Sequence, residues 1–426
     1  MIDLETLARE HRHLSRRYFL QLAATASSVA GLAPVAFGAR FAADEKTPEQ
    51  ELERLIAKLK YLTADERFFN VERGDPLPSE LAPEQRAAAG LDRETWRLEI
   101  VPDVESGAKV RKPLSKEAGT SLDWVGLMQL AEKHAVRYGK VMTCNNLDGP
   151  LGMGLWEGVP LRDVLALARP ADLIRRVWYY GYHNEKPEQM FRSSLAYSRV
   201  QEDPPGDMPV LVCYKLNGEW LSPKRGGPVR MLVPEAYGFK SVKWLQKIVL
   251  TNDHRANDTY ADQNNDIDSW QKTMARFVEA PLGAKAGQAI PITGLAQVGV
   301  GGLAKVQYSF EPAERERPAG DPNFTKCDWR DATLLPPPKN WGLPPDLDDG
   351  VPTPQEIDPQ TGKANIWPLR YTIAHWAVLA PGLPAGKYNL RCRSIDLRGV
   401  AQPLPRVVGR SGRNGIQTVP VEVTDG

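Results

Sequence analysis

The sequence predicts an α+β domain followed by a smaller β-sandwich of immunoglobulin type. Residues 96–250 mix strand-like segments with short helices and long loops, a pattern that favours an α+β domain over a doubly wound sheet. The composition changes after about residue 275, where short strand-like segments alternate with turn residues. We therefore expect the larger domain over residues 44–275 and the sandwich over residues 276–426.

The first part of the larger domain is expected to contain two helices and two strands. Residues 44–64 place leucine and isoleucine at helical spacing, and residues 123–131 form a second, short helical pattern with an acidic first turn. Residues 96–101 alternate as a strand does. Residues 141–143 are expected to form a buried strand that leads into Cys144.

Strands are expected to dominate the rest of this domain. Residues 158–160 (Gly-Val-Pro) predict a turn, and the proline suits the start of a helix over residues 161–168. Asn217-Gly218 is a hairpin signal. The strand-like segments are residues 177–180, 210–216, 229–233 and 242–250.

The expected sandwich is interrupted. Residues 281–310 alternate apolar residues with glycine, threonine and glutamine. A proline-rich insertion follows over about residues 312–368. Strand-like segments return over residues 371–423, most clearly at residues 386–393.

The composition excludes some classes of function. The chain has 426 residues, enough for two or three domains, and its hydrophobic and charged fractions are 42% and 25%. The formal net charge is only +1, and no cluster of basic residues is interleaved with aromatic ones. We therefore expect no nucleic-acid partner.

Residues 1–43 are predicted to be a twin-arginine signal peptide. Residues 15–17 are Ser-Arg-Arg, and the mildly apolar stretch over residues 20–36 is too short and weak to anchor in a bilayer. Small residues within 37–43 suit a cleavage site. This export route carries folded proteins, so we expect a periplasmic mature protein without a membrane span. The alternative is a basic, frayed N-terminus.

The chain has four cysteines, and they need not all form disulfides. Cys213 lies in an expected core strand. Cys327 and Cys392 both fall in the C-terminal region and could pair, but a sequence gives no distance between them. There is no Cys-x-x-Cys-His motif, so we expect no covalently attached haem in this chain.

Three sequence blocks carry the functional signal. Cys144 lies in V-M-T-C-N-N (residues 141–146), and W-E-G-V-P-L-R-D-V-L follows at residues 156–165. The third block is G-G-P-V-R-M-L-V-P-E-A-Y-G-F-K-S-V-K-W-L at residues 226–245. A lone cysteine is often a small buried hydrophobic residue, but its thiolate is also a soft metal ligand. In this order and spacing the blocks resemble the sulfite oxidase family of molybdenum–pterin enzymes, over roughly residues 65–426.

The resemblance implies a molybdenum–molybdopterin cofactor, with Cys144 as the protein ligand of the metal and as a catalytic residue. The pterin carries a phosphate and polar edges, so it needs cationic donors nearby. Arg225 stands where the family has histidine or asparagine before Gly-x-Pro-x-Arg. The cofactor-binding residues that the resemblance implies are Asn70, His183, Arg225, Arg230, Ser241, Val242 and Lys243.

Some of these residues have structural alternatives. Tyr260 corresponds to a family tyrosine beside the substrate and is a catalytic candidate, or it is a surface-loop tyrosine. His183 could line the cofactor pocket or be a structural histidine, and Asn70 could instead stabilise its own turn. We expect Lys240 and Lys247 to be solvated residues at a strand edge.

One departure from the family bears on the substrate. Sulfite-oxidising relatives carry an arginine shortly after the cysteine, and a guanidinium suits a sulfite anion. Here Cys144 is followed by Asn-Asn-Leu-Asp, so another basic residue would have to supply that charge. A neutral sulfoxide needs no such charge, so a sulfoxide reductase of the same family is the first alternative.

The expected function is oxygen-atom transfer that oxidises sulfite or a related sulfur compound. Electrons would pass to an external carrier such as a periplasmic cytochrome c. The second domain mediates dimerisation in the family, and Asp396-Leu397-Arg398-Gly399 resembles its signature, so a homodimer is expected. A non-catalytic binding protein that keeps the fold is the second alternative.

Overall fold

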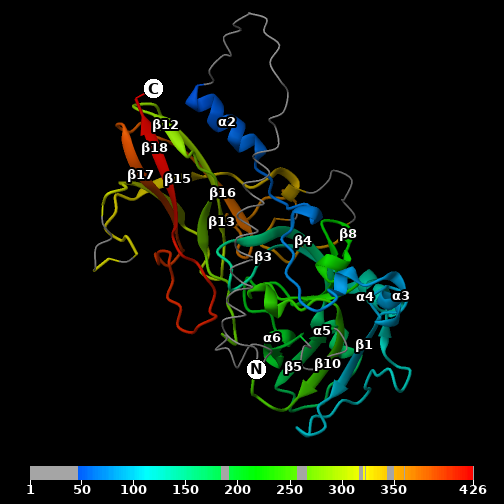
Figure 1. The fold of residues 1–426 in the computed structure, drawn as a ribbon. Helices are drawn as coiled ribbons and strands as arrows, with labels where there is room; N and C mark the ends of the chain where they lie inside the picture. The colour runs from blue at the N-terminus through cyan, green and yellow to red at the C-terminus, as the bar shows by residue number, and fades with distance from the viewer. Residues whose placement is uncertain are drawn as a thin grey trace, which may run out of the picture. The chain divides into compact units, whose positions relative to one another are not determined.

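The computed structural model describes residues 47–183, 191–256, 266–315, 320–321, 323–342, 350–358 and 360–425. Thr47–Gly426 forms one compact unit (Figure 1). The expected signal peptide lies outside the described residues. Within the described ranges, no helix is both long enough and apolar enough to cross a bilayer.

The α-helices of the described chain are short and precede residue 202. The expected first helix is α2, which begins at Pro48 after the N-cap Thr47, whose hydroxyl accepts a hydrogen bond from the Gln50 amide. The second begins after Asp123, whose carboxylate caps the Gly126 amide at 2.8 Å. The helices are α2 (Pro48–Lys58), α3 (Pro83–Ala88), α4 (Trp124–His134), α5 (Leu161–Ala166) and α6 (Tyr197–Gln201). Short 3₁₀ helices are η1 (Asp65–Arg67), η2 (Pro78–Glu80), η4 (Pro223–Arg225), η5 (Gly238–Lys240) and η7 (Lys339–Gly342).

The first sheet has the strand order β2-β1-β10-β5-β6. Its strands are β1 (Arg97–Pro102), β2 (Leu122–Asp123), β5 (Arg176–Gly181), β6 (Phe191–Ala196) and β10 (Leu245–Thr251). Only the β1–β10 pair within it is parallel. Its apolar side chains form a core with Leu127 of α4 and Leu161 and Val164 of α5. The mixed pairing and the flanking short helices agree with the α+β expectation.

The second sheet holds the segment that ends at Cys144. Its strands are β3 (Val136–Thr143), β4 (Pro150–Pro160), β7 (Leu211–Leu216), β8 (Glu219–Trp220) and β9 (Arg230–Leu232), and β9 pairs with β7. The turn expected at residues 158–160 is wrong, because β4 continues through it. A side chain at Gly158 would lie 2.5 Å from the Val212 carbonyl oxygen, so this glycine permits the close pairing of β4 with β7.

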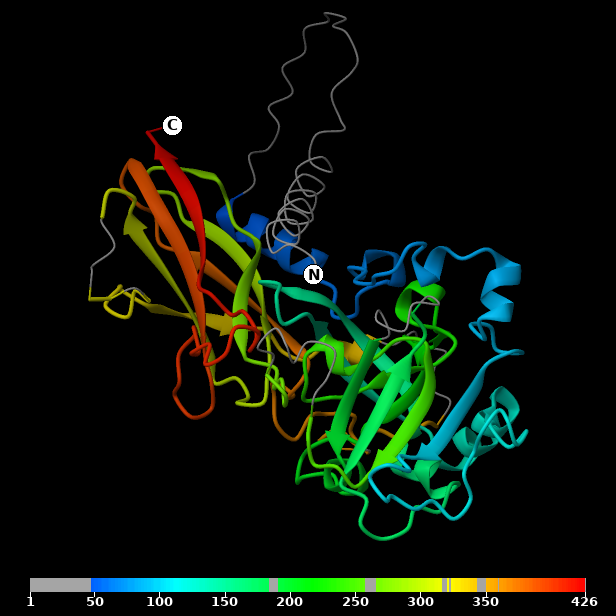
Figure 2. The ribbon, with the colours of Figure 1, turned by 60° about the horizontal axis from the view of Figure 1, so that its bottom comes forward.

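The C-terminal strands form a sheet of order β11-β13-β16-β15-β14-β17-β18-β12. They are β11 (Met274–Glu279), β12 (Gly283–Lys285), β13 (Ile290–Gln297), β14 (Lys305–Pro312), β15 (Arg330–Leu334), β16 (Ile373–Ala380), β17 (Gly386–Ile395) and β18 (Gln417–Thr424). Figure 2 shows β17 and β18 side by side in orange and red. Ile292, Trp376 and Leu390 meet in one buried core. An immunoglobulin-type sandwich stays a prediction.

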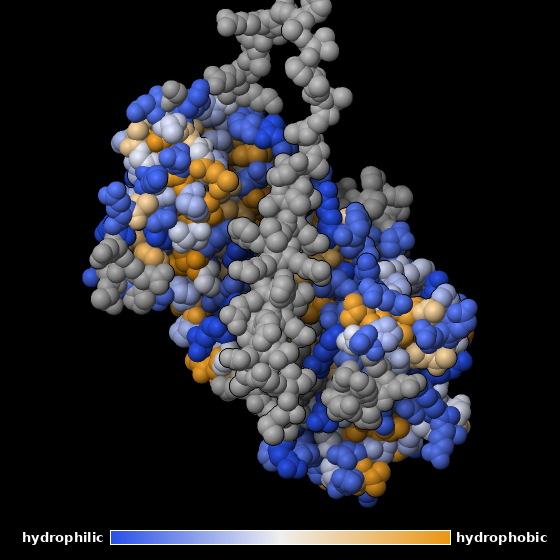
Figure 3. Space-filling model, viewed as in Figure 1, coloured by the Kyte–Doolittle hydropathy of each residue, from blue (hydrophilic) through white to orange (hydrophobic). Residues whose placement is uncertain are grey.

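Residues of the C-terminal half are hydrogen-bonded directly to β3. The Val141 amide donates to the Tyr371 carbonyl at 2.7 Å. Gln355, in the proline-rich insertion, accepts from the Gly139 amide at 3.0 Å and donates to the Gly139 carbonyl at 2.9 Å. The strand that carries Cys144 is therefore fixed from both halves of the chain. On the face in Figure 3, hydrophobic residues form separate patches between hydrophilic ones.

Candidate functional site

Cys144 follows the last residue of β3 and is half-buried. Its thiol is hydrogen-bonded to Asn146 Oδ1. Burial raises the pKa of this thiol, while hydrogen bonds from the Asn146 and Asn145 backbone and the charge of Arg410 act in the opposite direction. The backbone donors and the cation are the groups that would stabilise a thiolate here.

The expected cofactor cations form one cluster. Arg230 is buried, and its guanidinium donates to the Arg225 carbonyl at 2.8 Å and to the Ser241 carbonyl at 2.7 Å. The guanidinium also lies 5.2 Å from the centre of the Trp156 ring. Burial lowers the pKa of Arg230 to about 10, because the enclosed guanidinium loses its hydration, and a bound anion would stabilise its charge.

Lys243 joins this cluster to the early asparagine. Its ammonium donates to Asn70 Oδ1 at 2.8 Å and to the Lys224 carbonyl at 2.6 Å. Burial, followed by the Arg230 charge, lowers the pKa of Lys243 well below its ordinary value. Arg225 is buried too and makes a 3.2 Å ion pair with Asp65. The structure brings together Asn70, Arg225, Arg230, Ser241 and Lys243.

A glycine makes the close approach within the cluster possible. Gly226 has φ +92°, in the left-handed region, and a side chain there would lie 2.6 Å from Lys243 Cβ. The Trp244 amide donates to the Gly226 carbonyl at 3.1 Å. Trp244 itself has φ +52°, which is why β10 begins at Leu245 and not at the expected residue 242. The turn therefore brings the segment of Arg225 and Gly226 into close contact with the segment of Lys243.

The remaining predicted site residues are His183, Val242 and Tyr260. His183 is buried and follows Tyr182, whose amide donates to the Trp244 carbonyl at 2.8 Å, so it lies beside the Lys243 segment. Val242 is buried, and a side chain at position 181 would lie 2.7 Å from its Cγ1. Tyr260 lies outside the described residues. The cofactor and catalytic roles of these residues stay predictions.

One continuous segment, residues 230–243, joins the cationic cluster to the Cys144 strand. It begins at Arg230, and its Gly238 packs so closely on β3 that a side chain there would lie 3.2 Å from the Thr143 carbonyl oxygen. It then returns to the cluster at Ser241 and Lys243. The cysteine and the cations therefore belong to one framework.

Two buried side chains of β3 were missed by the sequence analysis. Lys140 is fully buried, and its Nζ lies 2.9–3.1 Å from the Pro234 and Ala236 carbonyls and from Gln271 Oε1. Burial lowers the pKa of Lys140 to about 7. Thr143 Oγ1 hydrogen-bonds Gln297 Oε1. A lysine within an apolar strand was the available signal for the first of them.

Lys240 corrects another expectation. It is buried rather than solvated, and its ammonium donates to the Ser194 carbonyl at 3.0 Å. The 3₁₀ turn η5 (Gly238–Lys240) directs it inward, where its ammonium lies 5.6 Å from the centre of the Phe239 ring. Lys247, on β10, is exposed as expected.

Arginines from the C-terminus lie over the cysteine loop, which the sequence analysis did not anticipate. Asn145 Nδ2 donates to the Arg410 carbonyl at 3.2 Å, and the Arg413 amide donates back to the Asn145 carbonyl at 3.0 Å. Arg413 also makes a 3.5 Å ion pair with Asp148. The run P-R-V-V-G-R-S-G-R at residues 405–413 was the available signal, because it spaces three arginines along one loop.

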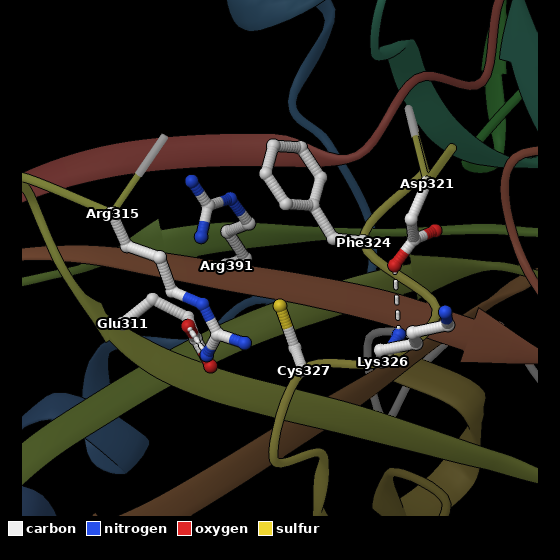
Figure 4. A pocket seen from close by; sticks show the side chains of 7 residues that line it. All are labelled: Glu311, Arg315, Asp321, Phe324, Lys326, Cys327 and Arg391. Atoms are coloured by element: carbon white, nitrogen blue, oxygen red, sulfur yellow. Dashed lines mark hydrogen bonds and ion pairs between the residues drawn. The ribbon is translucent and has the colours of Figure 1, made fainter. Parts of the chain in front are cut away.

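The four cysteines are free, which answers the question about Cys327 and Cys392. Cys327 lines a small pocket with Glu311, Phe324 and Arg391 (Figure 4). Cys392 follows Arg391 on β17, so it points to the opposite face of the sheet, where it is buried in the core. The two thiols are therefore on different faces.

The side chains present suit a metal cofactor that carries most of its own ligands. Among the described residues, no group of three or more histidine, cysteine, aspartate or glutamate side chains could hold a metal ion. A single cysteine in one framework with buried cations fits a molybdenum–pterin cofactor, whose dithiolene supplies the other sulfur ligands and whose phosphate requires cations. The residues thus fit that group.

Comparison with known proteins identifies a molybdopterin binding domain in the chain. Residues 87–259, which include Cys144, Arg230 and Lys243, match the family described as an oxidoreductase molybdopterin binding domain. The chain therefore contains an oxidoreductase molybdopterin binding domain, and it is similar to members of the sulfite oxidase family. The match ends at residue 259, so it does not cover the C-terminal sheet.

The relatives support the same assignment. The mitochondrial sulfite oxidase of Drosophila melanogaster is 28% identical over 183 residues, which are 41% of this chain and 30% of that protein. An NADPH nitrate reductase of Pichia angusta is 38% identical over 98 residues, 23% of this chain but 11% of the reductase. The chain thus spans less than a third of these curated relatives. The sulfane dehydrogenase SoxCD of Paracoccus pantotrophus shares the fold, with TM-score 0.55, 17% identity, and 93% and 95% of the two chains covered.

Proposed function

We propose that this protein is an exported oxidoreductase that oxidises sulfite or a related sulfur compound. The sulfur atom would gain an oxygen atom that derives from water, and an electron pair and the protons of that water would leave. The electrons would pass to an external carrier, for which a periplasmic cytochrome c is the candidate. The twin-arginine pattern at residues 15–17 supports export, and the signature at residues 396–399 supports a homodimer.

The observation that carries the proposal is the buried cationic cluster joined to a single cysteine. A bound molybdenum–pterin would supply the oxygen-atom transfer. Arg230 and Lys243 would hold its anionic and polar edges with charge-assisted hydrogen bonds, and Asn70 fixes the Lys243 ammonium at 2.8 Å. Cys144, at the end of a strand hydrogen-bonded on both edges, would supply the thiolate.

An anionic substrate is favoured by the arginine loop. The sequence carries no arginine directly after Cys144. Arg410, more than 260 residues further along the chain, is nevertheless close enough for its charge to act on the Cys144 thiol. A guanidinium near the reacting centre would attract and orient an oxyanion. The names of two similar proteins, a sulfite oxidase and a sulfane dehydrogenase, also support a sulfur substrate.

The sulfoxide reductase is the second candidate. It is favoured by Asp148, which neutralises part of the loop through its 3.5 Å ion pair with Arg413. A neutral sulfoxide would tolerate that arrangement, whereas an oxyanion would be repelled by the carboxylate.

The test is sulfite-dependent reduction of ferricyanide by protein whose molybdenum content has been measured. We expect activity in the wild type and in Cys327→Ala, a cysteine that lines a different pocket. We expect none in Cys144→Ala. A molybdenum-loaded wild type without sulfite activity would reject the substrate, and methionine sulfoxide would then be assayed with a reduced dye. A protein purified without any molybdenum would favour the non-catalytic alternative.

A further inference from the structure

Lys272 joins the two ends of the arginine loop. It lies between Gln271 and Thr273, just before β11, and is half-buried. Its ammonium donates to the Pro405 carbonyl at 2.9 Å and to the Gly412 carbonyl at 3.3 Å. The two acceptors enclose residues 405–412, so one side chain closes the loop. In Figure 1 the loop belongs to the orange-to-red connection between β17 and β18.

The backbone of this loop is bonded to the residue after the cysteine. The Arg410 carbonyl accepts from Asn145 Nδ2 at 3.2 Å and from the Asp266 amide at 3.4 Å. The Arg413 amide donates to the Asn145 carbonyl at 3.0 Å. Asn145 is therefore held on two sides by the loop, and any shift of the loop is transmitted to the peptide that orients Cys144.

The backbone of Lys272 is anchored independently of its ammonium. Its carbonyl accepts from Gln297 Nε2 at 2.8 Å, and Gln297 Oε1 accepts from Thr143. The neighbouring Gln271 accepts from the buried Lys140 at 3.1 Å. Because these bonds stay in place when the side chain is altered, a substitution at Lys272 acts on the loop and not on β3.

Tyr237 packs against both Lys272 and the arginine loop. Tyr237 is fully buried, and its hydroxyl accepts from the Lys272 amide at 3.3 Å. Gly412 has φ +81°, and a side chain there would lie 2.3 Å from the Tyr237 hydroxyl oxygen. Burial and the nearby Arg406 charge lower the pKa of Lys272, and the Asp266 charge acts in the opposite direction.

We propose that Lys272 is a positioning residue that holds residues 405–412 against Asn145 and so sets Arg410 relative to Cys144 for an anionic substrate. The substrate part of this inference rests on the proposed function. The positioning part rests on the hydrogen bonds alone. Lys272 would act through the loop and would not touch the substrate.

Hydrogen exchange on the molybdenum-loaded full chain tests the positioning without turnover. In Lys272→Met we expect the amide of Arg413 to exchange on the order of tenfold faster, because two bonds from a charged donor are lost. Lys272→Arg should restore slow exchange. Lys305→Met, which alters an exposed lysine on β14, should leave the loop unchanged. Unchanged exchange of residues 405–413 in Lys272→Met would overturn the proposal.

Steady-state kinetics with sulfite tests the consequence. We expect Lys272→Met to raise KM on the order of tenfold with kcat within about twofold of wild type, since the loop positions the anion and the metal ligand stays in place. Lys272→Arg should restore KM. A fall in kcat at constant KM would overturn the assignment to substrate positioning. Faster loop exchange in a protein whose wild type does not oxidise sulfite would reject the proposed function alone.

Discussion

The buried lysine of β3 allows a quantitative prediction about the site framework. Lys140 is fully enclosed, and its ammonium lies 2.9 Å from the Pro234 carbonyl and 3.0 Å from the Ala236 carbonyl. Burial, opposed in part by Glu235, lowers its pKa from 10.5 to about 7. The folded protein therefore binds this proton less tightly than the unfolded chain does. Its free energy of unfolding should rise with pH between about 7 and 10.5, because the buried ammonium loses its charge there.

The size of the effect follows from that pKa difference. One pKa unit corresponds to about 1.4 kcal/mol, so complete deprotonation of Lys140 should stabilise the folded state by about 5 kcal/mol. About 3 kcal/mol of this should appear between pH 6 and 9. Lys140→Met removes the titrating group. It lowers the absolute stability, because the Pro234 and Ala236 carbonyls lose their donor, but it should also remove this part of the pH dependence.

Urea unfolding of the cofactor-free protein, followed by tryptophan fluorescence between pH 6 and 9, measures the free energy of unfolding and its dependence on pH. The difference in free energy of unfolding between wild type and Lys140→Met should widen by about 3 kcal/mol over this range. Lys305→Met, at an exposed lysine, should run parallel to the wild type. Parallel curves for wild type and Lys140→Met would refute the reasoning, because they would mean that the oxygen acceptors keep the ammonium charged despite its burial.

Three further predictions concern the cofactor, the stability of the turn at Gly226 and the substrate. Lys243→Met should reduce the molybdenum content to roughly a tenth of wild type or less, measured by elemental analysis of purified protein, because a half-buried cation of the cluster is lost. Gly226→Ala should lower the free energy of unfolding by more than ~1 kcal/mol beyond the loss in Gly287→Ala. Both glycines have positive φ, but only position 226 lacks room for a side chain. Equal losses for the two variants in urea unfolding would contradict this. Arg410→Gln should raise KM for sulfite on the order of tenfold at nearly constant kcat, whereas Arg330→Gln on β15 should not.

The local part of the site could be predicted from the sequence. Cys144, Arg230 and Lys243 stand in short blocks with recognisable neighbours, and Asn70 was a candidate that the structure places 2.8 Å from the Lys243 ammonium. These residues could be found because glycines and apolar strand residues around them produce a strong local pattern. The family resemblance followed from the same blocks, whereas the α+β character followed from the mixture of strand-like segments and short helices.

The long-range part could not be predicted. The contact between Asn145 and Arg410 joins residues 265 positions apart, and no periodicity or turn signal records such a pairing. The burial of Lys240 depends on the 3₁₀ turn that ends at this residue, and the turn has no sequence signal comparable to a capped helix. The continuation of β4 through Gly158 depends on the close approach of β7, so it too is a tertiary effect.

Molybdenum K-edge X-ray absorption of the purified protein tests the central claim most directly. The wild type and Cys327→Ser should contain molybdenum with the same sulfur coordination. Cys144→Ser should show one sulfur ligand fewer and no sulfite-dependent reduction of ferricyanide. An unchanged sulfur count in Cys144→Ser would contradict the assignment of Cys144 as the metal ligand. A protein that binds no molybdenum would contradict the account as a whole.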